Sequence, residues 1–370
     1  MRKMLITGGA GFIGGNFVHH WARHHPGDVV VVLDVLTYAG NLATIREHIE
    51  REAIEFVRGD ITDAALVRRT LAEFEIDTIV HFAAESHVDR SIVDPGAFVR
   101  TNVIGTQVLL DEARRAWHSD GAWRSGVRFH HVSTDEVYGT LSPTDPPFSE
   151  STPYSPSSPY AASKAGSDHL VRAYVHTYGL PATISNCSNN YGPFHFPEKL
   201  IPLTIVNALH GKPLPIYGDG RQIRDWLFVG DHCVAIDRIL HAPAEGRTYN
   251  VGGRAEHENI TIVRQICALL DERLGNDIAT GARFPDCPAA RGNRCDSLIT
   301  HVKDRPGHDR RYAIDPTRIA SELAFEPAET LTTGLARTVD WYLANEAWWR
   351  GVMDGSYLQW IDTNYAGRAI

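Results

Sequence analysis

The sequence predicts an α/β fold in which helices cover both faces of a doubly wound parallel sheet. Strand and helix patterns alternate through the first half of the 370 residues, and the early strands are continuous apolar runs. Such runs are typical of parallel strands that are buried on both faces. A further observation is the spacing Gly8-x-x-Gly11-x-x-Gly14, which lies between the first expected strand and the first expected helix.

Each element is predicted from its own local pattern. In chain order, strands are expected at Lys3–Thr7, Val29–Leu33, Ile54–Arg58, Thr78–Phe82, Arg128–Ser133, Ala182–Asn186 and, as a late return, Thr248–Val251. Helices are expected at Phe12–His24, Ala64–Phe74, Phe98–Trp117, Tyr160–Tyr178 and Thr330–Ala344. Strands that alternate with helices in this way indicate a parallel sheet built from βαβ units.

The regular alternation stops near residue 190. The segment from Pro193 to Asp225 contains five prolines and few periodic elements, so we expect it to form loops folded over a site. The later stretch Gly281–Arg311 is rich in Arg, Gly and Pro. We therefore expect a Rossmann-type nucleotide-binding domain over 1–190, to which the chain returns near 228–255. Residues 191–370 are expected to form mainly a smaller C-terminal substrate-binding lobe.

Composition excludes several classes of protein. Hydrophobic residues make up 43% and charged residues 22%, as in ordinary globular proteins. The formal net charge of −9 argues against general nucleic-acid binding, and no apolar run approaches the roughly 18 residues that a membrane span needs. The chain enters a strand at once, which leaves no room for a signal peptide and favours the cytoplasm.

Cysteine and histidine spacings predict no metal site. The five cysteines are scattered, form no CxxC pair and are expected to be reduced structural thiols. The neighbouring pairs His19-His20, His24-His25 and His130-His131 do not form a metal-binding pattern, and we expect most histidines to be surface or packing residues.

The glycine turn and a following acid predict a dinucleotide site. Gly8, Gly11 and Gly14 allow a tight turn and close approach to a pyrophosphate at a helix N-terminus; simple turn chemistry is the alternative. Asp34 ends the second strand, where its carboxylate can accept from ribose hydroxyls and would repel a 2′-phosphate, so NAD is favoured over NADP. Asp60 could reach the adenine, although a solvated loop carboxylate is an equally simple interpretation.

Tyr160 and Lys164 are candidates for removing a hydroxyl proton during hydride transfer. They are four residues apart and so share one face of a helix. Tyrosine has a pKa near about 10, and a nearby Lys164 ammonium and a positive nicotinamide would both lower it. Ser133 and Thr134 end a strand, where open α/β sheets bind ligands. The alternative is a surface helix whose Tyr and Lys meet nothing.

Asp135 and Glu136 follow Thr134 directly and suggest elimination of water as well as hydride transfer. One carboxylate can remove a proton next to a ketone while a protonated carboxyl donates to a leaving hydroxyl. Adjacent loop acids are also often simply solvated. In the second half, Arg224, Arg305 and His308 are candidate anion-binding cations, although exposed arginines are commonly solvated too.

The chain resembles the dTDP-glucose 4,6-dehydratases of the extended short-chain dehydrogenase/reductase superfamily over essentially its whole length. The most specific matching motifs are His81–Ile92, Ser133–Gly139, Ser158–Lys164, Asn186–Pro193, Phe196–Pro202 and Arg305–Tyr312. Small departures are the short loop 140–148, the glycines Gly15 and Gly166, and a divergent stretch at 287–300, which lies just before Arg305.

The resemblance implies a lyase that converts dTDP-glucose to dTDP-4-keto-6-deoxyglucose and water, with NAD as the cofactor. Tyr160 and Lys164 would oxidise C4, and Thr134 would hold the C4 oxygen. Glu136 would remove the C5 proton, Asp135 would protonate the departing C6 hydroxyl, and hydride would return to C6. The product would serve deoxysugar biosynthesis, with the rhamnose of a surface polysaccharide such as lipopolysaccharide, or an antibiotic sugar, as destination.

The resemblance also implies the binding residues. The implied cofactor contacts are Gly8, Gly11, Phe12, Ile13, Gly14, Asp34, Tyr38, Asp60, Ile61, Ala83, Ala84, Ser86, Thr101, Tyr160, Lys164 and Asn189. The implied substrate contacts are Ser86, His87, Thr134, Asn190, Glu198, Lys199, Leu200, Pro215, Tyr217, Arg224, Asn259, Arg305, His308 and Tyr357. Relatives are homodimers that pair through helices including the one with the Tyr-x-x-x-Lys motif.

Three alternatives remain open. A nucleotide-sugar 4-epimerase or decarboxylase on the same scaffold would need Tyr160 and Lys164 but not the Asp135-Glu136 pair. A GDP-mannose dehydratase would be expected to prefer NADP, against Asp34. A non-catalytic NAD-binding regulator would be free to lose Tyr160, Lys164 or Glu136, and all three are present.

Overall fold

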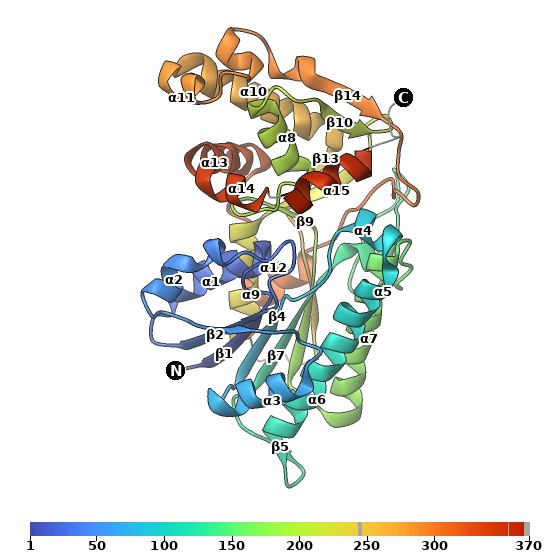
Figure 1. Cartoon of the computed structure of the whole chain (residues 1–370). Helices are drawn as coiled ribbons and strands as arrows, with labels where there is room; N and C mark the ends of the chain where they lie inside the picture. Colours follow the sequence, from blue (N-terminus) through green and yellow to red (C-terminus); the bar gives the residue numbers. More distant parts are fainter. Residues whose placement is uncertain (243–245, 354, 366–370) are drawn as a thin grey trace.

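A seven-stranded parallel sheet forms the centre of the first lobe in the computed structural model, which describes residues 1–242, 246–353 and 355–365 (Figure 1). The strand order is β12-β8-β7-β4-β1-β2-β3, and every pairing is parallel. The strands are β1 Lys3–Thr7, β2 Val29–Asp34, β3 Glu55–Arg58, β4 Thr78–His81, β7 Arg128–Thr134, β8 Ala182–Cys187 and β12 Thr248–Val251. The predicted fold class and all seven predicted strands are confirmed, with ends shifted by one residue in most.

Alternate residues of these strands supply two separate cores. Met4 and Ile6 of β1 pack with Phe17 of the first helix, whereas Leu5 of the same strand packs with Leu109 on the opposite face. The covering helices are α1 Phe12–His24, α2 Arg46–Glu50, α3 Ala64–Glu73, α6 Thr106–Trp117, α7 Pro159–Tyr178 and α9 Val229–His241. Helices α1 and α9 cover one face, and α3, α6 and α7 cover the other (Figure 1).

The second lobe has its own core of side chains from residues 191–349. Its helices are α8 Leu200–Leu209, α10 Asn259–Asn276, α11 Ile278–Arg283, α13 Leu331–Ala344, α14 Glu346–Val352 and α15 Gly355–Tyr365. Its strands are β9 Asn189–Tyr191, β10 Leu214–Tyr217, β11 Ile223–Phe228, β13 Glu256–Glu258 and β14 Ile299–Val302, arranged as the small sheets β10-β14 and β13-β11-β9.

Short elements complete the chain. They are α4 Val88–Val93, α5 Pro95–Phe98, a π-helical turn Val99–Gly105, the hairpin β5 His118–Ser119 and β6 Ala122–Trp123, and α12 Thr317–Leu323, which packs on β12. Single 3₁₀ turns lie at Leu42–Thr44, Asp135–Tyr138, Pro288–Arg291 and Cys295–Leu298. None of the helices in the described ranges combines the length and apolar character that a membrane span requires. The domain boundaries 1–190 and 191–370 stay a prediction.

The structure corrects two predictions of secondary structure. The segment Pro193–Asp225, expected to be loops, contains α8, β10 and the start of β11. Helix α8 is buried on nearly all sides, so its sequence lacks the polar face by which an amphipathic helix is recognised. The second correction is the single helix expected over Phe98–Trp117, which is instead α5, the π-helical turn and α6.

Candidate active site

A cavity of about 490 Å³ lies where the carboxyl ends of the central strands face the second lobe. Open α/β sheets bind ligands at this edge. All the predicted site residues line this cavity except Tyr38 and Tyr357. The rings of these two tyrosines pack against Phe196, with centroid distances of 5.8 and 5.7 Å, and Phe196 itself lines the cavity. Both tyrosines therefore contact a residue that lines the cavity without lining it themselves.

The glycine turn brings the N-terminus of α1 against the cavity. Gly8 has a φ of 71°, and a Cβ there would lie 2.6 Å from the Ala83 nitrogen. A Cβ on Gly14 would overlap the Gly8 carbonyl oxygen. No side chain caps α1 at Gly11, so the first N–H groups of the helix are left for a ligand. The turn therefore fits the pyrophosphate of a dinucleotide.

Asp34 lies at the end of β2 beside this turn. Its carboxylate accepts hydrogen bonds from the backbone N–H groups of Ala10 (3.0 Å) and Leu36 (2.8 Å). Burial raises the pKa of Asp34, and these two hydrogen bonds offset part of the effect. The backbone thus fixes the carboxylate at the edge of the cavity, where it can accept from ribose hydroxyls.

Thr134, Asp135 and Glu136 enter the cavity from the end of β7. Thr134 caps the following 3₁₀ turn: its Oγ1 accepts from the Glu136 N–H at 3.3 Å and lies 3.4 Å from Asp135 Oδ1. Gly139 ends the turn with a φ of 94°, where a Cβ would overlap the Ser155 carbonyl. The sharp turn directs two successive carboxyl groups into the same space.

Tyr160 and Lys164 lie on the buried face of α7, as their spacing predicted. Ser158 caps the helix by accepting from the Ala161 N–H at 3.1 Å, which places Tyr160 in the first turn. The Lys164 ammonium donates to the Val132 carbonyl oxygen at 2.9 Å, and burial lowers the pKa of Lys164.

The expected lowering of the Tyr160 pKa is wrong for the protein alone. Burial raises the pKa of the Tyr160 hydroxyl well above its usual value, and the nearby Glu136 adds to this, while a hydrogen bond with Thr134 opposes it. A positive charge from outside the chain is therefore needed to favour the tyrosinate, as the oxidised nicotinamide ring would provide.

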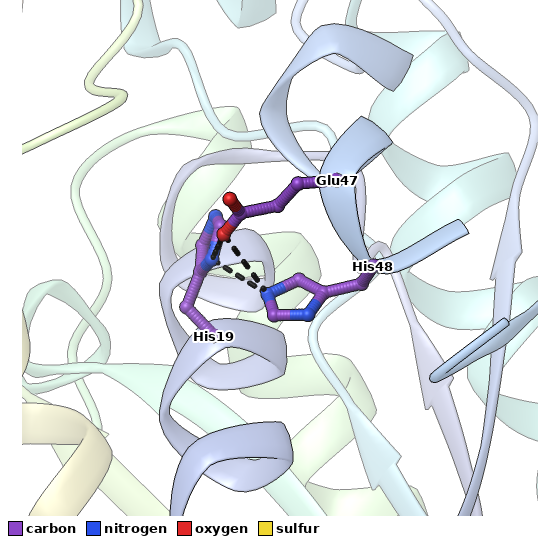
Figure 2. A group of neighbouring side chains, drawn as sticks. All are labelled: His19, Glu47 and His48. Atoms are coloured by element: carbon purple, nitrogen blue, oxygen red, sulfur yellow. Dashed lines mark hydrogen bonds and ion pairs between the residues drawn. The ribbon is translucent and has the colours of Figure 1, made fainter. Parts of the chain in front are cut away.

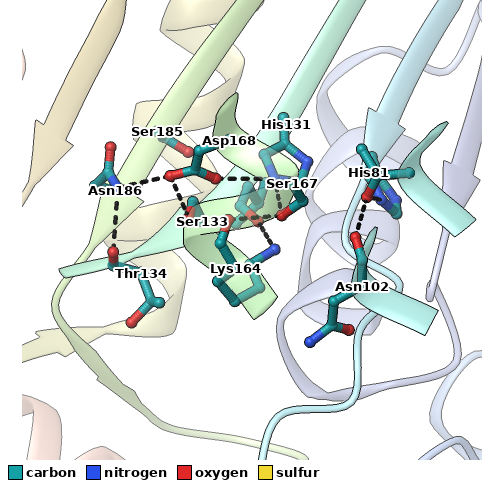
Figure 3. A network of polar contacts seen from close by, with 12 residues as sticks. His81, Asn102, His131, Ser133, Thr134, Lys164, Ser167, Asp168, Ser185 and Asn186 are labelled. Atoms are coloured by element: carbon teal, nitrogen blue, oxygen red, sulfur yellow. Dashed lines mark hydrogen bonds and ion pairs between the residues drawn. The ribbon is translucent and has the colours of Figure 1, made fainter. Parts of the chain in front are cut away.

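Lys164 is part of a buried polar network that includes Asp168, Ser133 and His131 (Figure 3). Asp168 lies one helical turn after Lys164, and its carboxylate accepts from Ser133 at 2.9 Å and Tyr154 at 2.8 Å and lies 3.1 Å from His131 Nε2. Burial alone would raise the pKa of Asp168, but these partners and the Lys164 charge hold it below its usual value. Asp168 therefore keeps a negative charge beside Lys164.

The two carboxyl groups of Asp135 and Glu136 have different surroundings. Burial raises the pKa of Asp135 well above its usual value, and the carboxylates of Glu136 and Asp225 add to the effect. Burial also raises the pKa of Glu136, but the cations Arg305, Arg224 and Lys199 all lower it. Both pKa values are therefore raised, but several cations offset the effect at Glu136, whereas neighbouring carboxylates reinforce it at Asp135.

Two arginines form the cationic end of the cavity. Arg224 donates to the carbonyl oxygens of Ile223 (2.7 Å) and Asp309 (2.9 Å). Because both partners are uncharged carbonyl groups, they do not neutralise the positive charge of Arg224. Arg305 pairs with Asp89 at 2.9 Å, and Tyr217 donates to the same carboxylate. Such planar cations suit a phosphate group.

Buried polar atoms around the cavity lack protein partners. Within the described ranges these include Asp135 Oδ2, Asn189 Oδ1, His87 Nδ1, Asn259 Oδ1 and Arg305 Nε. Buried polar groups in native proteins are nearly always paired. Their concentration at one cavity therefore indicates a polar ligand with many hydrogen-bonding groups.

Sequence reasoning missed several residues of this site. Asp89 positions Arg305 and lies within the matching motif His81–Ile92, which was the available signal. Asp168 follows Lys164 by four residues, so helical spacing could have found it. Asp309, whose carbonyl oxygen accepts from Arg224, likewise lies within a matching motif, Arg305–Tyr312.

Comparisons with known proteins agree with this geometry. The family model described as GDP-mannose 4,6 dehydratase matches residues 5–338. The dTDP-glucose 4,6-dehydratase of Xanthomonas campestris pv. campestris is 56% identical over 96% of this chain and 97% of its own length, and that of Neisseria meningitidis is 53% identical over 96% and 98%.

A solved structure is also similar over nearly the whole chain. DesIV, the dTDP-glucose 4,6-dehydratase of Streptomyces venezuelae solved with NAD and TYD bound, has a TM-score of 0.82 and 45% sequence identity, covering 95% of this chain and 100% of that one. The same cavity thus holds an oxidation pair, an elimination pair and a dinucleotide turn on a scaffold shared with these enzymes. The chain belongs to the family of dTDP-glucose 4,6-dehydratases.

Proposed function

We propose that the chain is an NAD-dependent hydro-lyase that converts dTDP-glucose to dTDP-4-keto-6-deoxyglucose and water. The observation that carries this proposal is the meeting of Asp135 and Glu136 with Thr134, Tyr160 and Lys164 at one cavity. An epimerase or decarboxylase would need only the last three residues, and the similarity to dTDP-glucose 4,6-dehydratases supports the use of all five.

Oxidation at C4 is assigned to Tyr160. In its ionised form the Tyr160 oxygen would accept the proton of the C4 hydroxyl, while Thr134 would hold the C4 oxygen by a hydrogen bond. Lys164, fixed by the Val132 carbonyl and charged beside Asp168, would stabilise the tyrosinate.

Elimination is assigned to the two carboxyl groups. Glu136, whose ionised form is favoured by three surrounding cations against the effect of burial, would remove the C5 proton that the C4 ketone makes acidic. Asp135, kept protonated by burial and neighbouring carboxylates, would donate its proton to the departing C6 hydroxyl. Both pKa values are raised, but the cations around Glu136 offset its shift, so the different surroundings favour Glu136 as the base and Asp135 as the acid.

NAD would supply a hydride acceptor at C4 and a hydride donor at C6, so that no net oxidation occurs. The glycine turn, the uncapped N-terminus of α1 and the fixed Asp34 carboxylate fit this cofactor. An Asp at this position argues against a 2′-phosphate and therefore against NADP. The remaining implied cofactor contacts stay predictions.

Substrate binding is assigned to the second lobe. Arg224 and Arg305 would hold the diphosphate, and the unpaired Asn259 oxygen would accept from another part of the nucleotide sugar. His87, Asn190, Glu198 and Lys199 line the same cavity and would contact the glucose ring, although Lys199 already donates to the Ser86 carbonyl at 3.1 Å.

We also infer a homodimer. Four of the exposed large apolar side chains, Ile92, Val93, Val99 and Ile104, lie on the α4–π-turn segment that packs on α7. Clusters of this kind are typical of interaction surfaces. A cytoplasmic location stays a prediction.

Isotope transfer tests the proposed reaction directly. Purified protein incubated with dTDP-glucose deuterated at C4 should give a product that carries deuterium at C6 and has lost one water, as measured by mass spectrometry. UDP-glucose and GDP-mannose serve as comparison substrates and should react far more slowly. Stoichiometric release of reduced cofactor into solution, or loss of the label, would refute the proposal.

A further inference from the structure

Three side chains from α1 and α2 converge outside the active-site cavity (Figure 2). His19 lies on α1, and Glu47 and His48 are neighbours on α2. Nδ1 of His19 lies 2.8 Å from Nε2 of His48 and 3.4 Å from a Glu47 carboxylate oxygen, which is itself 3.6 Å from His48 Nε2. Three potential metal ligands therefore face one common point.

The His19 ring is held with one nitrogen directed at this point. Its Nε2 lies 2.8 Å from the Thr44 carbonyl oxygen, which can only accept, so Nε2 carries the proton and Nδ1 presents a lone pair. Gly15, one turn earlier on α1, makes this approach possible, because a Cβ there would lie 2.5 Å from Thr44 Cγ2. A carbonyl bonded to the second nitrogen is the usual support of a metal-binding histidine.

Hydrogen bonding within the group leaves it electron-rich. When both imidazoles are neutral, only His48 Nε2 can carry a proton that points toward the centre. That single N–H can donate to His19 Nδ1 or to the Glu47 carboxylate, but one of the two acceptors is left without a donor. The His19 lone pair and the carboxylate oxygen then face each other at 3.4 Å. A cation at the centre would satisfy all three atoms.

The separations match those around a small transition-metal ion. Zinc bonds to histidine nitrogen and carboxylate oxygen are about 2.0–2.2 Å, so ligand atoms of a tetrahedral site lie roughly 3.4 Å apart. The observed separations of 2.8, 3.4 and 3.6 Å surround this value. We propose that His19, Glu47 and His48 form a binding site for a divalent transition-metal ion of the zinc type, with water completing the coordination.

The donor set selects the class of ion. Two imidazole nitrogens and one carboxylate suit zinc and neighbouring transition metals, whereas magnesium and calcium prefer oxygen ligands. A second histidine group is already paired: His20 and His25 hydrogen-bond to the Asp237 carboxylate, and His241 hydrogen-bonds to the Asp237 backbone carbonyl oxygen. Their nearness alone therefore does not make a metal site.

The proposed ion would join elements of the NAD-binding half. It would connect α2 to α1, the helix whose N-terminus lies at the cofactor turn. His19 also stacks on Phe194 at a centroid distance of 5.1 Å, and the neighbouring His195 stacks on Phe12 of the cofactor turn at 4.1 Å. Since none of the three ligands lines the cavity, the ion would stabilise the fold and take no part in the reaction.

Metal binding can be measured on the full-length protein. Chelator-treated protein, resaturated with NAD, is titrated with Zn²⁺ by calorimetry and, separately, with Co²⁺ as a spectroscopic probe. We expect one site per chain, visible absorption typical of Co²⁺ with few ligands, and a higher Tm with Zn²⁺ but not with Mg²⁺. His48→Asn should weaken binding by more than the roughly 10–100-fold that loss of an outer-shell partner costs, and it should remove the Tm shift.

Two further variants complete the metal-binding experiment, one as a control and one as a second test of the ligands. His24→Asn removes an exposed histidine from the same helix and should bind Zn²⁺ as the parent does. Glu47→Gln keeps the shape of the side chain and should also weaken Zn²⁺ binding. It therefore tests the same site if His48→Asn does not fold. Equal Zn²⁺ affinity in parent, His48→Asn and Glu47→Gln, or no stoichiometric site in the parent, would overturn the proposal.

Discussion

At the scale of single residues, Asp135 and Glu136 carry the same functional group in different surroundings. Burial raises the pKa of both groups, and partners from elsewhere in the chain separate them: Asp225 adds to the shift of Asp135, while Arg305 and Lys199 oppose that of Glu136. Oxidation and elimination would then depend on different residues of one cavity. Mutations should accordingly stop the reaction at different stages.

Tyr160→Phe and Glu136→Gln should each lower turnover by about 10²–10⁴-fold, the usual effect of losing a positioned acid or base. Tyr160→Phe cannot accept the C4 proton, so mixing with dTDP-glucose should leave the bound cofactor oxidised. Glu136→Gln retains Tyr160, so reduced cofactor and a 4-keto sugar should accumulate. Stopped-flow absorbance with quenched product analysis measures both.

The milder variant Asp135→Asn provides the comparison. Solvent can partly replace an acid, so this variant should slow water loss less than Glu136→Gln does. Normal turnover by Glu136→Gln, or reduced cofactor in Tyr160→Phe but not in Glu136→Gln, would contradict the assignment.

Asp135→Asn should also stabilise the fold at neutral pH. Because the folded-state pKa of Asp135 is raised, the folded protein binds this proton more tightly than the unfolded chain does, and stability falls as pH rises from the ordinary pKa toward the raised one. Asparagine does not ionise, so Asp135→Asn avoids this loss of stability at higher pH. We expect a gain of about 0.5–2 kcal/mol, the size common for relieving a functional conflict.

Thermal unfolding between acid and neutral pH measures this effect. The gain should shrink toward acid pH, where Asp135 is protonated in both the folded and unfolded states. The exposed Asp120 is the control, since Asp120→Asn should give no such pH-dependent gain. A lower Tm for Asp135→Asn at neutral pH would show that the buried carboxyl is not strained.

Sequence alone could predict the identity of these residues but not their protonation. Thr134, Asp135 and Glu136 follow a recognisable strand, and parallel strand ends meet at one edge of a sheet, so their location follows from local pattern. Protonation depends on Arg224, Arg305 and Asp225, which reach the site from the second lobe. Their approach is a property of tertiary packing, which no local pattern contains.

At the scale of elements, the parts with regular periodicity were predictable and the buried or bent parts were not. The strands of the central sheet are apolar runs bounded by turns, and α1 matches its predicted range, Phe12–His24. Helix α8 was not predicted from the sequence because it is buried on nearly every side and so has no polar face. The π-helical turn was not predicted either; within it, the Asn102 side chain bonds both the N–H and the carbonyl of Glu85, a tertiary contact that no local pattern contains.

The close contact between α1 and the glycine turn gives a prediction at this scale. In Gly14→Ala the added Cβ would overlap the Gly8 carbonyl oxygen, which must move to relieve the clash. Overpacking of this kind costs about 1–3 kcal/mol. If the turn displaced is the one that binds the pyrophosphate, NAD affinity should fall roughly tenfold or more.

The measurement is the NAD content of the purified variant together with its NAD affinity after stripping. Gly27→Ala is the matched control, because a Cβ at Gly27 would meet nothing within 4 Å. Unchanged NAD retention by Gly14→Ala would show that this turn does not hold the cofactor.

At the scale of the whole molecule, the site depends on both lobes. The central sheet supplies Thr134, Asp135 and Glu136, and the second lobe supplies Arg224 and Arg305. One surface of the first lobe exposes apolar side chains that do not line the cavity. Ile92 and Val93 of α4 and Val99 and Ile104 of the π-helical turn are each at least 40% exposed, and both elements pack against α7.

A two-fold symmetric dimer would cover this surface with an identical copy. In such a dimer each residue of the patch appears twice in the interface, so a single charged substitution places two unpaired charges in the apolar interface. Val93, which is 74% exposed, and Ile104, which is 48% exposed, can be changed without disturbing the core. Val93→Asp and Ile104→Asp should therefore weaken the dimer while the monomer stays folded.

Multi-angle light scattering at micromolar concentration tests this prediction. The parent should have twice the 41.0 kDa mass of one chain, and the double variant Val93→Asp/Ile104→Asp should shift toward the monomer mass with unchanged circular dichroism. Ile278→Asp is the control: Ile278 is 88% exposed on the second lobe, away from α7, and its substitution should leave the dimer intact. A monomeric parent, or a double variant that dimerises as tightly as the parent, would place the interface elsewhere or exclude it. Because the patch adjoins α7, which carries Tyr160 and Lys164, dissociation should also lower the Tm more than the loss of two apolar side chains alone would.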